Sequence, residues 1–214
     1  MRPNTLILLG HPDRNSFCAA LADVCMSRAT AAGHKVRVLR LGELIFDPVL
    51  HHGYGQVQPL EPDLLRAQSD ILWADHLVLV FPVWWGGIPG LMKGFIDRVF
   101  LPGFAFKFHK GKAFPEALLK GRTADLLVTL DTPPWYYRWL YRMPALHQMR
   151  KTTLQFCGIR PLKTLMFGPV SGSTPPQRAG WLQQTGTLFE KRTFHVHRQS
   201  RAVVRHQHQG DSSL

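Results

Sequence analysis

The sequence predicts a doubly wound α/β domain, in which a five-stranded parallel sheet carries helices on both faces. The main observation is that short, continuous apolar runs alternate with stretches whose apolar residues recur at helical spacing. Parallel neighbours in a sheet need a long return connection, so this alternation indicates parallel strands joined by crossover helices. The second observation is size, because 214 residues, 45% of them hydrophobic and 19% charged, suffice for one core of this kind.

The first half of the chain contains patterns for three strands and three helices. Residues 5–9 form an apolar run ending at Gly10, which is typical of a strand buried on both faces. Helical spacing begins at Phe17, with Ser16 as the expected N-cap, and continues to about Gly33. The other elements expected here are a strand over 35–41, a surface loop over 51–59, a helix opened by Asp63, a strand over 76–81 closed by Pro82, and a helix starting at Pro89.

The second half is expected to complete the sheet. After a Gly- and Lys-rich excursion over 102–121, the expected elements are a strand over 125–130, a long helical stretch within 138–156, a strand within 161–168, and a final helix over about 176–191. We therefore expect one folded domain over residues 1–192. Residues 193–214 are rich in His and Arg without helical or strand periodicity, and they are expected to form a flexible tail.

The net charge of +12 predicts attraction to anions. Three anions fit: the phosphate of a nucleotide, an acidic protein surface, and an anionic lipid headgroup. The basic tail over 193–214 is the candidate contact for the last two. No nucleic-acid recognition motif accompanies the charge, so no specific nucleic-acid partner is expected. In the helix that starts at Pro89, Asp97 and Arg98 are expected to lie on the polar flank, as solvated or dimer-edge charges.

The apolar pattern of the sequence bears on where the protein is located in the cell. The longest uncharged stretch, residues 77–92, is interrupted by Pro and Gly, which argues against a membrane span. The first residues lack the features of a secretory signal, so we expect a cytoplasmic protein, with the tail as a candidate contact at the inner membrane face.

Cys18, Cys25 and Cys157 lack the paired spacing of a zinc or redox site, and we expect buried, reduced thiols and no metal.

The loop after the first strand has the features of a phosphate site. In doubly wound sheets, ligands bind beyond the carboxyl ends of the strands. A turn from a strand into a helix presents free N–H groups and the positive end of the helix dipole, and Asn15 and Ser16 add side-chain donors. His11 and Arg14 can add charge-assisted hydrogen bonds, although His11 also fits a turn residue satisfied by its own neighbours. The loop lacks the glycine pattern of dinucleotide sites and the lysine of triphosphate sites.

The loop after the third strand offers aromatic walls. Trp84 and Trp85 are adjacent on a Gly-rich loop, and a planar heteroaromatic ligand needs flat apolar walls beside peptide N–H and C=O groups. Consecutive side chains usually point apart. We therefore expect one tryptophan on a cofactor and the other on a subunit interface or substrate pocket. The alternative is that one of them is a core or interface residue only.

The second loop and the helix after it carry a longer motif. Residues 82–100 read Pro-Val-Trp-Trp-Gly-Gly-Ile-Pro-Gly-Leu-Met-Lys-Gly-Phe-Ile-Asp-Arg-Val-Phe. This run resembles the signature of the flavodoxin-like NAD(P)H:quinone oxidoreductases, the family of NAD(P)H dehydrogenase (quinone) and modulator of drug activity B. The loop with His11, Ser16 and Phe17 is similar too, as are residues 103–106 and 156–158, so the resemblance covers about residues 5–190. It implies a flavodoxin-like fold and a flavin-bearing homodimer that takes hydride from NADH or NADPH and passes two electrons to a quinone.

The resemblance also implies roles for individual residues. FMN is the first choice of cofactor, because one helix-end phosphate site suits one phosphate, while FAD stays open. Tyr137 matches the family's tyrosine by spacing and is the expected catalytic residue, donating to a carbonyl, with Tyr136 as the competitor. Arg14, Arg138 and Arg142 are candidates for contact with a 2′-phosphate, which favours NADPH. The expected cofactor-binding residues are His11, Arg14, Asn15, Ser16, Phe17, Cys18, Pro82, Val83, Trp84, Trp85, Gly86, Asp131 and Thr132.

The third loop departs from the family. Members typically have Thr-Thr-Gly-Gly before the tyrosine, whereas residues 129–137 read Thr-Leu-Asp-Thr-Pro-Pro-Trp-Tyr-Tyr. Pro133 and Pro134 remove two N–H donors and stiffen the turn. A carboxylate near the flavin's pyrimidine side would repel the reduced ring, so we expect Asp131 to cap the turn that follows. The alternative function is a regulatory or ancillary subunit that docks on an acidic protein or a membrane transporter.

Overall fold

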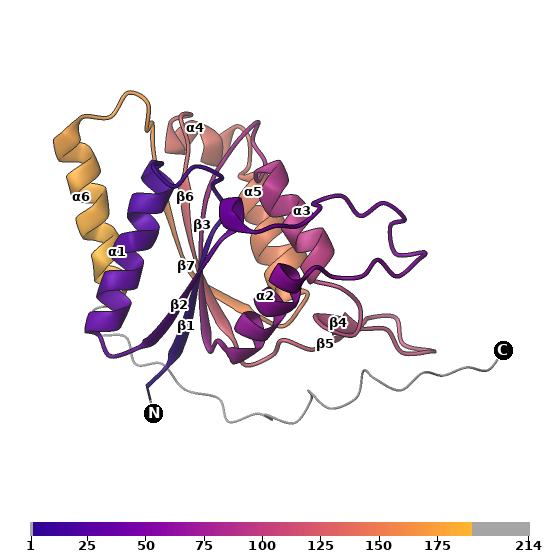
Figure 1. Ribbon diagram of the computed structural model, residues 1–214. Helices are drawn as coiled ribbons and strands as arrows, with labels where there is room; N and C mark the ends of the chain where they lie inside the picture. The colour runs from indigo at the N-terminus through magenta and orange to yellow at the C-terminus, as the bar shows by residue number, and fades with distance from the viewer. Residues whose placement is uncertain (1, 190–214) are drawn as a thin grey trace.

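Five parallel strands form the central sheet of the computed structural model, which describes residues 2–189 (Figure 1). The strand order is β2-β1-β3-β6-β7, and it reverses between β1 and β3, which makes their carboxyl ends the switch point of the sheet. The expected doubly wound sheet is confirmed. The strands are β1 (Asn4–Leu9), β2 (Lys35–Arg40), β3 (His76–Pro82), β6 (Thr123–Thr129) and β7 (Arg160–Phe167).

The tail predicted over 193–214 lies outside the described residues, and so does the end of the domain predicted at 192. The docking role attached to that tail therefore stays a prediction. Within the described residues 2–189, no helix has the length and apolar character needed to cross a membrane.

Helices cover both faces of the sheet (Figure 1). On one face, α1 (Phe17–Ala31) and α6 (Pro175–Gly186) pack together, and the other face carries α2 (Pro62–Trp73), α3 (Gly90–Val99) and α5 (Pro144–His147). α1 begins where the sequence predicts, because the hydroxyl oxygen of Ser16 accepts the Ala19 N–H at 3.2 Å. The expected loop over 51–59 is confirmed as an exposed segment without regular structure.

Arg98 is buried, so the expectation of a solvated or dimer-edge charge on the polar flank of α3 is wrong for this residue. Its side chain is 0% exposed and pairs with Glu61, with Nη2 and Oε2 2.8 Å apart. The same guanidinium donates to the carbonyl oxygens of Asp47 and Pro59. The loop between η1 (Leu41–Glu43) and α2 folds over α3 and supplies these acceptors, whereas Asp97 stays at the surface and pairs with Lys93.

The helical stretch expected within 138–156 is divided into two parts. The first part is a short helix, α4 (Pro134–Trp139). The second part is α5, which continues directly into the π-helix η2 (Gln148–Gln155). Between them, Arg142 and Met143 have φ angles of 58° and 52°. Pro144 explains the break, because a proline disfavours the helical conformation in the residue before it and cannot continue the earlier helix.

The excursion over 102–121 contains a small antiparallel sheet that the sequence pattern did not indicate. Its strands are β4 (Phe106–Lys107) and β5 (Glu116–Ala117). It lies at the opposite end of the central sheet from α4 (Figure 1). Strands of two residues carry too few side chains to show an alternating pattern.

The three cysteines are free and buried, as expected. Burial raises the pKa of Cys18 to about 12, despite its hydrogen bond with Thr129, and raises the pKa of Cys157 to about 12. The thiols are therefore protonated at neutral pH and are poor nucleophiles. Within residues 2–189, no group of three metal-ligating side chains comes together.

Candidate active site

A cavity of about 150 Å³ opens at the carboxyl ends of β1, β3 and β6, at the switch point of the sheet. All three loops that the sequence singles out contribute to it, and the loop after β7 adds Val170. Its lining consists of His11, Ser16, Phe17, Cys18, Pro82, Val83, Trp84, Thr129, Leu130, Asp131 and Val170.

The first loop is organised by Asp13, which the sequence reasoning missed. Its carboxylate accepts the Asn15 N–H at 2.8 Å, and its carbonyl oxygen accepts the hydroxyl of Ser16 at 2.8 Å. The Nδ1 atom of His11 accepts the Asp13 N–H at 3.0 Å. An Asp placed two residues before Asn in a Pro-containing loop is an Asx-turn signal, which could have identified this role.

The start of α1 leaves backbone donors at the cavity. The N–H groups of Phe17 and Cys18 lie in the first helical turn and have no intrahelical acceptor. Two residues predicted to assist them lie off the lining. Arg14 pairs with Glu43 at 2.5 Å, and Asn15 is exposed. At the cavity, this loop therefore presents the backbone donors of the helix start and not the guanidinium of Arg14.

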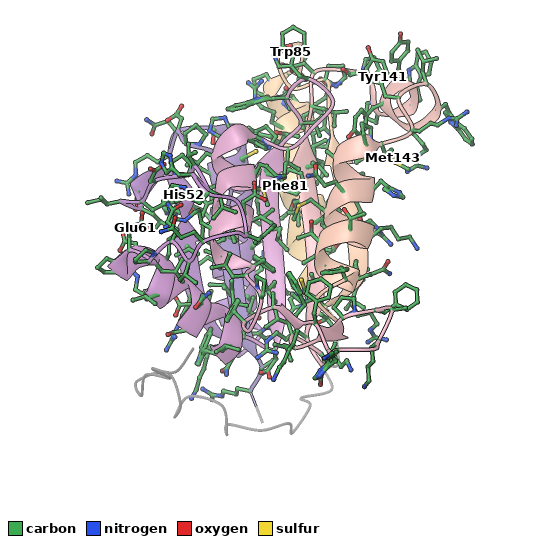
Figure 2. All side chains as sticks on the ribbon, turned by 90° about the vertical axis from the view of Figure 1, so that its right-hand side faces the viewer. His52, Glu61, Phe81, Trp85, Tyr141 and Met143 are labelled. Carbon is green, nitrogen blue, oxygen red and sulfur yellow. The ribbon has the colours of Figure 1, made fainter. Side chains whose placement is uncertain are left out.

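The two tryptophans point apart, as the sequence predicts. Residues 84–87 form a tight turn in which the N–H and C=O groups of Trp84 and Gly87 bond reciprocally at 3.1 and 2.9 Å. Trp85 and Gly86 occupy its centre with φ angles of 52° and 76°. The Trp84 ring lines the cavity and meets the His11 ring edge to face, with centroids 5.4 Å apart. Trp85 projects into solvent at the end of the molecule (Figure 2).

Tyr137 lies beneath the tryptophan loop instead of in the cavity. Its side chain is 1% exposed, its hydroxyl donates to the Gly86 carbonyl oxygen at 3.0 Å, and the hydroxyl oxygen accepts the Ala145 N–H at 3.1 Å. Burial raises the pKa of Tyr137, although backbone N–H groups bonded to the oxygen act in the opposite direction. Tyr136, the competitor, stacks edge to face with Trp135 and Tyr141 and does not line the cavity.

We expect Tyr137→Phe to lower the free energy of unfolding by about 1 kcal/mol, because it removes the hydroxyl that donates to the Gly86 carbonyl oxygen and leaves the Ala145 N–H only its longer hydrogen bond, of 3.3 Å, to that same oxygen. Tyr136→Phe is the matched control and should change stability by less than about 0.5 kcal/mol. Urea denaturation of both variants measures the difference. Equal effects would contradict the bridging role of Tyr137.

Asp131 lines the cavity, but the expected capping of the next turn is wrong. Its carboxylate accepts the Ser171 N–H at 2.7 Å and so ties the third loop to the loop after β7. Ser171 lies beyond a neighbouring strand, and no local pattern joins it to Asp131. Thr132 is off the lining, and α4 starts after Pro133.

These residues fit a planar ligand that bears a phosphate. The first turn of α1 supplies donors for the phosphate, and Trp84 supplies a flat wall for a ring. Asp131 is the acidic residue of the lining, and its carboxylate is already held by a backbone donor. The cavity has room for part of such a ligand, with the rest lying toward solvent along the half-exposed Trp84.

The chain is similar to known proteins over most of its length. A family model described as a flavodoxin-like fold matches residues 3–187. An uncharacterized NAD(P)H oxidoreductase of Haemophilus influenzae is 31% identical over 172 residues, which cover 78% of this chain and 84% of the relative.

More distant relatives share most of the chain. NAD(P)H dehydrogenase (quinone) 1 of Cavia porcellus is 25% identical over 221 residues, which cover 87% of this chain and 77% of the relative. The solved NAD(P)H:quinone oxidoreductase of Methanothermobacter marburgensis superposes with a TM-score of 0.75 at 21% identity, over 89% of this chain and 99% of that one, and shows the same fold.

Proposed function

Because the chain belongs to the family of flavodoxin-like NAD(P)H oxidoreductases, we propose that it binds a flavin and transfers two electrons from NAD(P)H to a quinone or similar acceptor. The observation that carries this proposal is the position of Trp84 beside the first turn of α1, in one cavity at the switch point. Family membership supports the reaction class, and the cavity supports the place where it occurs.

FMN is the cofactor that the geometry favours. The N–H groups of Phe17 and Cys18 would hold its single phosphate, and Trp84 would stack on its ring. A bound flavin would supply the two-electron hydride chemistry between the nicotinamide and the acceptor. NADPH or NADH is the donor.

The chain's own side chains set the environment of the ring. The backbone N–H of Ser171 partly offsets the negative charge of Asp131, which would otherwise disfavour a reduced, anionic ligand nearby. The protonated thiol of Cys18 bonds to the Thr129 hydroxyl at 3.1 Å and adds no charge. Phe17 and Trp84 make part of the cavity wall apolar.

We also propose a homodimer. Large aromatic side chains remain exposed at the α4 end of the chain, and a second copy that covered them would remove apolar surface from water. They are Trp85, Trp135, Trp139 and Tyr141.

The proposed activity is tested by incubating the purified full chain with FMN or FAD and removing free flavin. We expect retained flavin absorption that bleaches when NADPH is added without oxygen and returns when a soluble benzoquinone follows. Failure to retain either flavin would overturn the proposal. Flavin retention without bleaching by NADPH or NADH would overturn the oxidoreductase assignment and leave flavin binding standing.

A further inference from the structure

A second and larger cavity, of about 290 Å³, lies along the edge strand β7. We call it the basic groove. Its walls come from the end of α4, from α5 and η2, and from β7. The floor is apolar, formed by Met143, Leu146 and Met166, and the cationic side chains on its walls are Arg138, Arg142, Arg150 and Lys151.

The cations of the basic groove have no acidic counterpart. The lining contains no Asp or Glu, and within residues 2–189 none of these four side chains forms an ion pair. Elsewhere, Arg14, Arg37 and Arg98 each pair with a carboxylate. Unpaired like charges gathered around one cavity repel one another, and a bound anion relieves that repulsion.

Side-chain and backbone geometry hold these groups in place. The Arg150 guanidinium donates to the Thr164 hydroxyl at 2.7 Å, which fixes it against β7. Arg142 and Met143 are consecutive residues in the left-handed region, an uncommon backbone for side chains of this size, and both line the groove. Arg150 and Lys151 of the lining belong to the π-helix η2, a conformation that is frequent at functional sites.

The basic groove lies close to the active-site loops. The hydroxyl of Tyr137 bridges the Gly86 carbonyl oxygen, in the tryptophan loop, and the Ala145 N–H, at the start of α5. Figure 2 shows Met143 just below Tyr141, at the end of the molecule where Trp85 projects. A ligand that spans both sites would therefore run along one end of the sheet.

We propose that the basic groove binds the adenosine 2′-phosphate end of NADPH. A volume of about 290 Å³ suits one nucleoside phosphate rather than a whole dinucleotide. The arginine and lysine side chains would hold the phosphate, and the methionine and leucine side chains would contact the adenine. This inference rests on the proposed function, because it names the feature of the electron donor that the chain selects. Arg14, the third candidate for this contact, is engaged with Glu43 instead.

The direct test is calorimetry on the full chain with 2′,5′-ADP, 5′-ADP and inorganic phosphate as separate probes. We expect 2′,5′-ADP to bind at least about tenfold more tightly than 5′-ADP or phosphate, because of the three only it carries a phosphate on the 2′ oxygen of the ribose. The variant Arg138→Gln/Lys151→Gln changes two exposed residues of the groove and should weaken 2′,5′-ADP binding by about tenfold or more.

The matched control is Lys110→Gln/Lys112→Gln, which makes the same change in net charge at two exposed residues between β4 and β5, at the opposite end of the central sheet from α4 (Figure 1). It should leave 2′,5′-ADP binding unchanged. Equal weakening in both double variants, equal binding of 2′,5′-ADP and 5′-ADP, or no binding of 2′,5′-ADP would overturn the inference.

Kinetics separate this inference from the proposed function. In the flavin-loaded protein, the groove variant should raise the KM for NADPH by about tenfold and leave the KM for NADH unchanged. Unchanged KM values for both donors would overturn the inference and leave the proposed function intact. If the wild-type chain binds no flavin, the proposed function fails, and calorimetry with 2′,5′-ADP still decides the role of the groove.

Discussion

Replacing Arg98 with Ala should lower the free energy of unfolding by about 3–5 kcal/mol, because the change leaves the Glu61 carboxylate partly buried without its cation. It also removes the donor to the carbonyl oxygens of Asp47 and Pro59, so the loop over 47–61 loses its anchor on α3. A loss of this size is a large part of the stability of an ordinary domain. Urea denaturation at neutral pH measures it.

Arg66→Ala is the matched control, since Arg66 pairs with Asp63 at 3.2 Å while remaining 61% exposed. Surface pairs of this kind contribute about 0–1 kcal/mol. The double variant Arg98→Met/Glu61→Gln should recover part of the loss, because no unpaired charge remains. If Arg98→Ala and Arg66→Ala cost the same, the buried pair does not anchor the loop.

Low pH should weaken the pairing of Glu61 with Arg98 and so lower the free energy of unfolding. Partial burial alone would raise the pKa of Glu61, but hydrogen bonds from backbone N–H groups and from Arg98 outweigh it and hold the pKa below its ordinary value of 4.5. The unfolded state therefore takes up a proton more readily. The stability that Glu61 contributes is fully present above pH 4.5 and is lost as the pH falls through the lower, folded value.

Trp84→Ala should weaken FMN binding by about 10- to 100-fold, by analogy with aromatic stacking on nucleic-acid bases, which contributes about 1–3 kcal/mol per ring. Trp84 lines the cavity beside the first turn of α1, so its loss removes the flat wall and leaves the phosphate donors intact. Quenching of FMN fluorescence on titration with protein measures the dissociation constant.

Trp85→Ala provides the control, because Trp85 is adjacent in sequence and points into solvent. It should leave the dissociation constant of FMN within about threefold of the wild-type value. The opposite result, with Trp85→Ala weakening FMN and Trp84→Ala having no effect, would place the ring on the outer side of the turn and contradict the site described above.

The parts of the fold that local patterns determine could be predicted from the sequence. The strand predicted over 76–81 contains a continuous apolar run over 77–81, and its residues are buried in β3. The divergence of Trp84 and Trp85 follows from their adjacency on a turn. The position of the cavity follows from the rule that parallel sheets bind ligands at the carboxyl ends of their strands.

The parts that depend on distant partners could not be predicted. Arg98 looks like a surface charge because its acceptors lie 37–51 residues away. Asp131 bonds to Ser171, 40 residues later, and Tyr137 bonds to Gly86, 51 residues earlier. Such pairs leave no periodic signal, because the sheet topology, and not the local sequence, brings them together.

A crystal structure of the full chain grown with FMN tests the central claim most directly. We predict the phosphate within hydrogen-bond distance of the Phe17 and Cys18 N–H groups and the isoalloxazine ring stacked on Trp84. Density for FMN elsewhere on the chain, or a crevice filled by the chain's own residues 131–134, would contradict it.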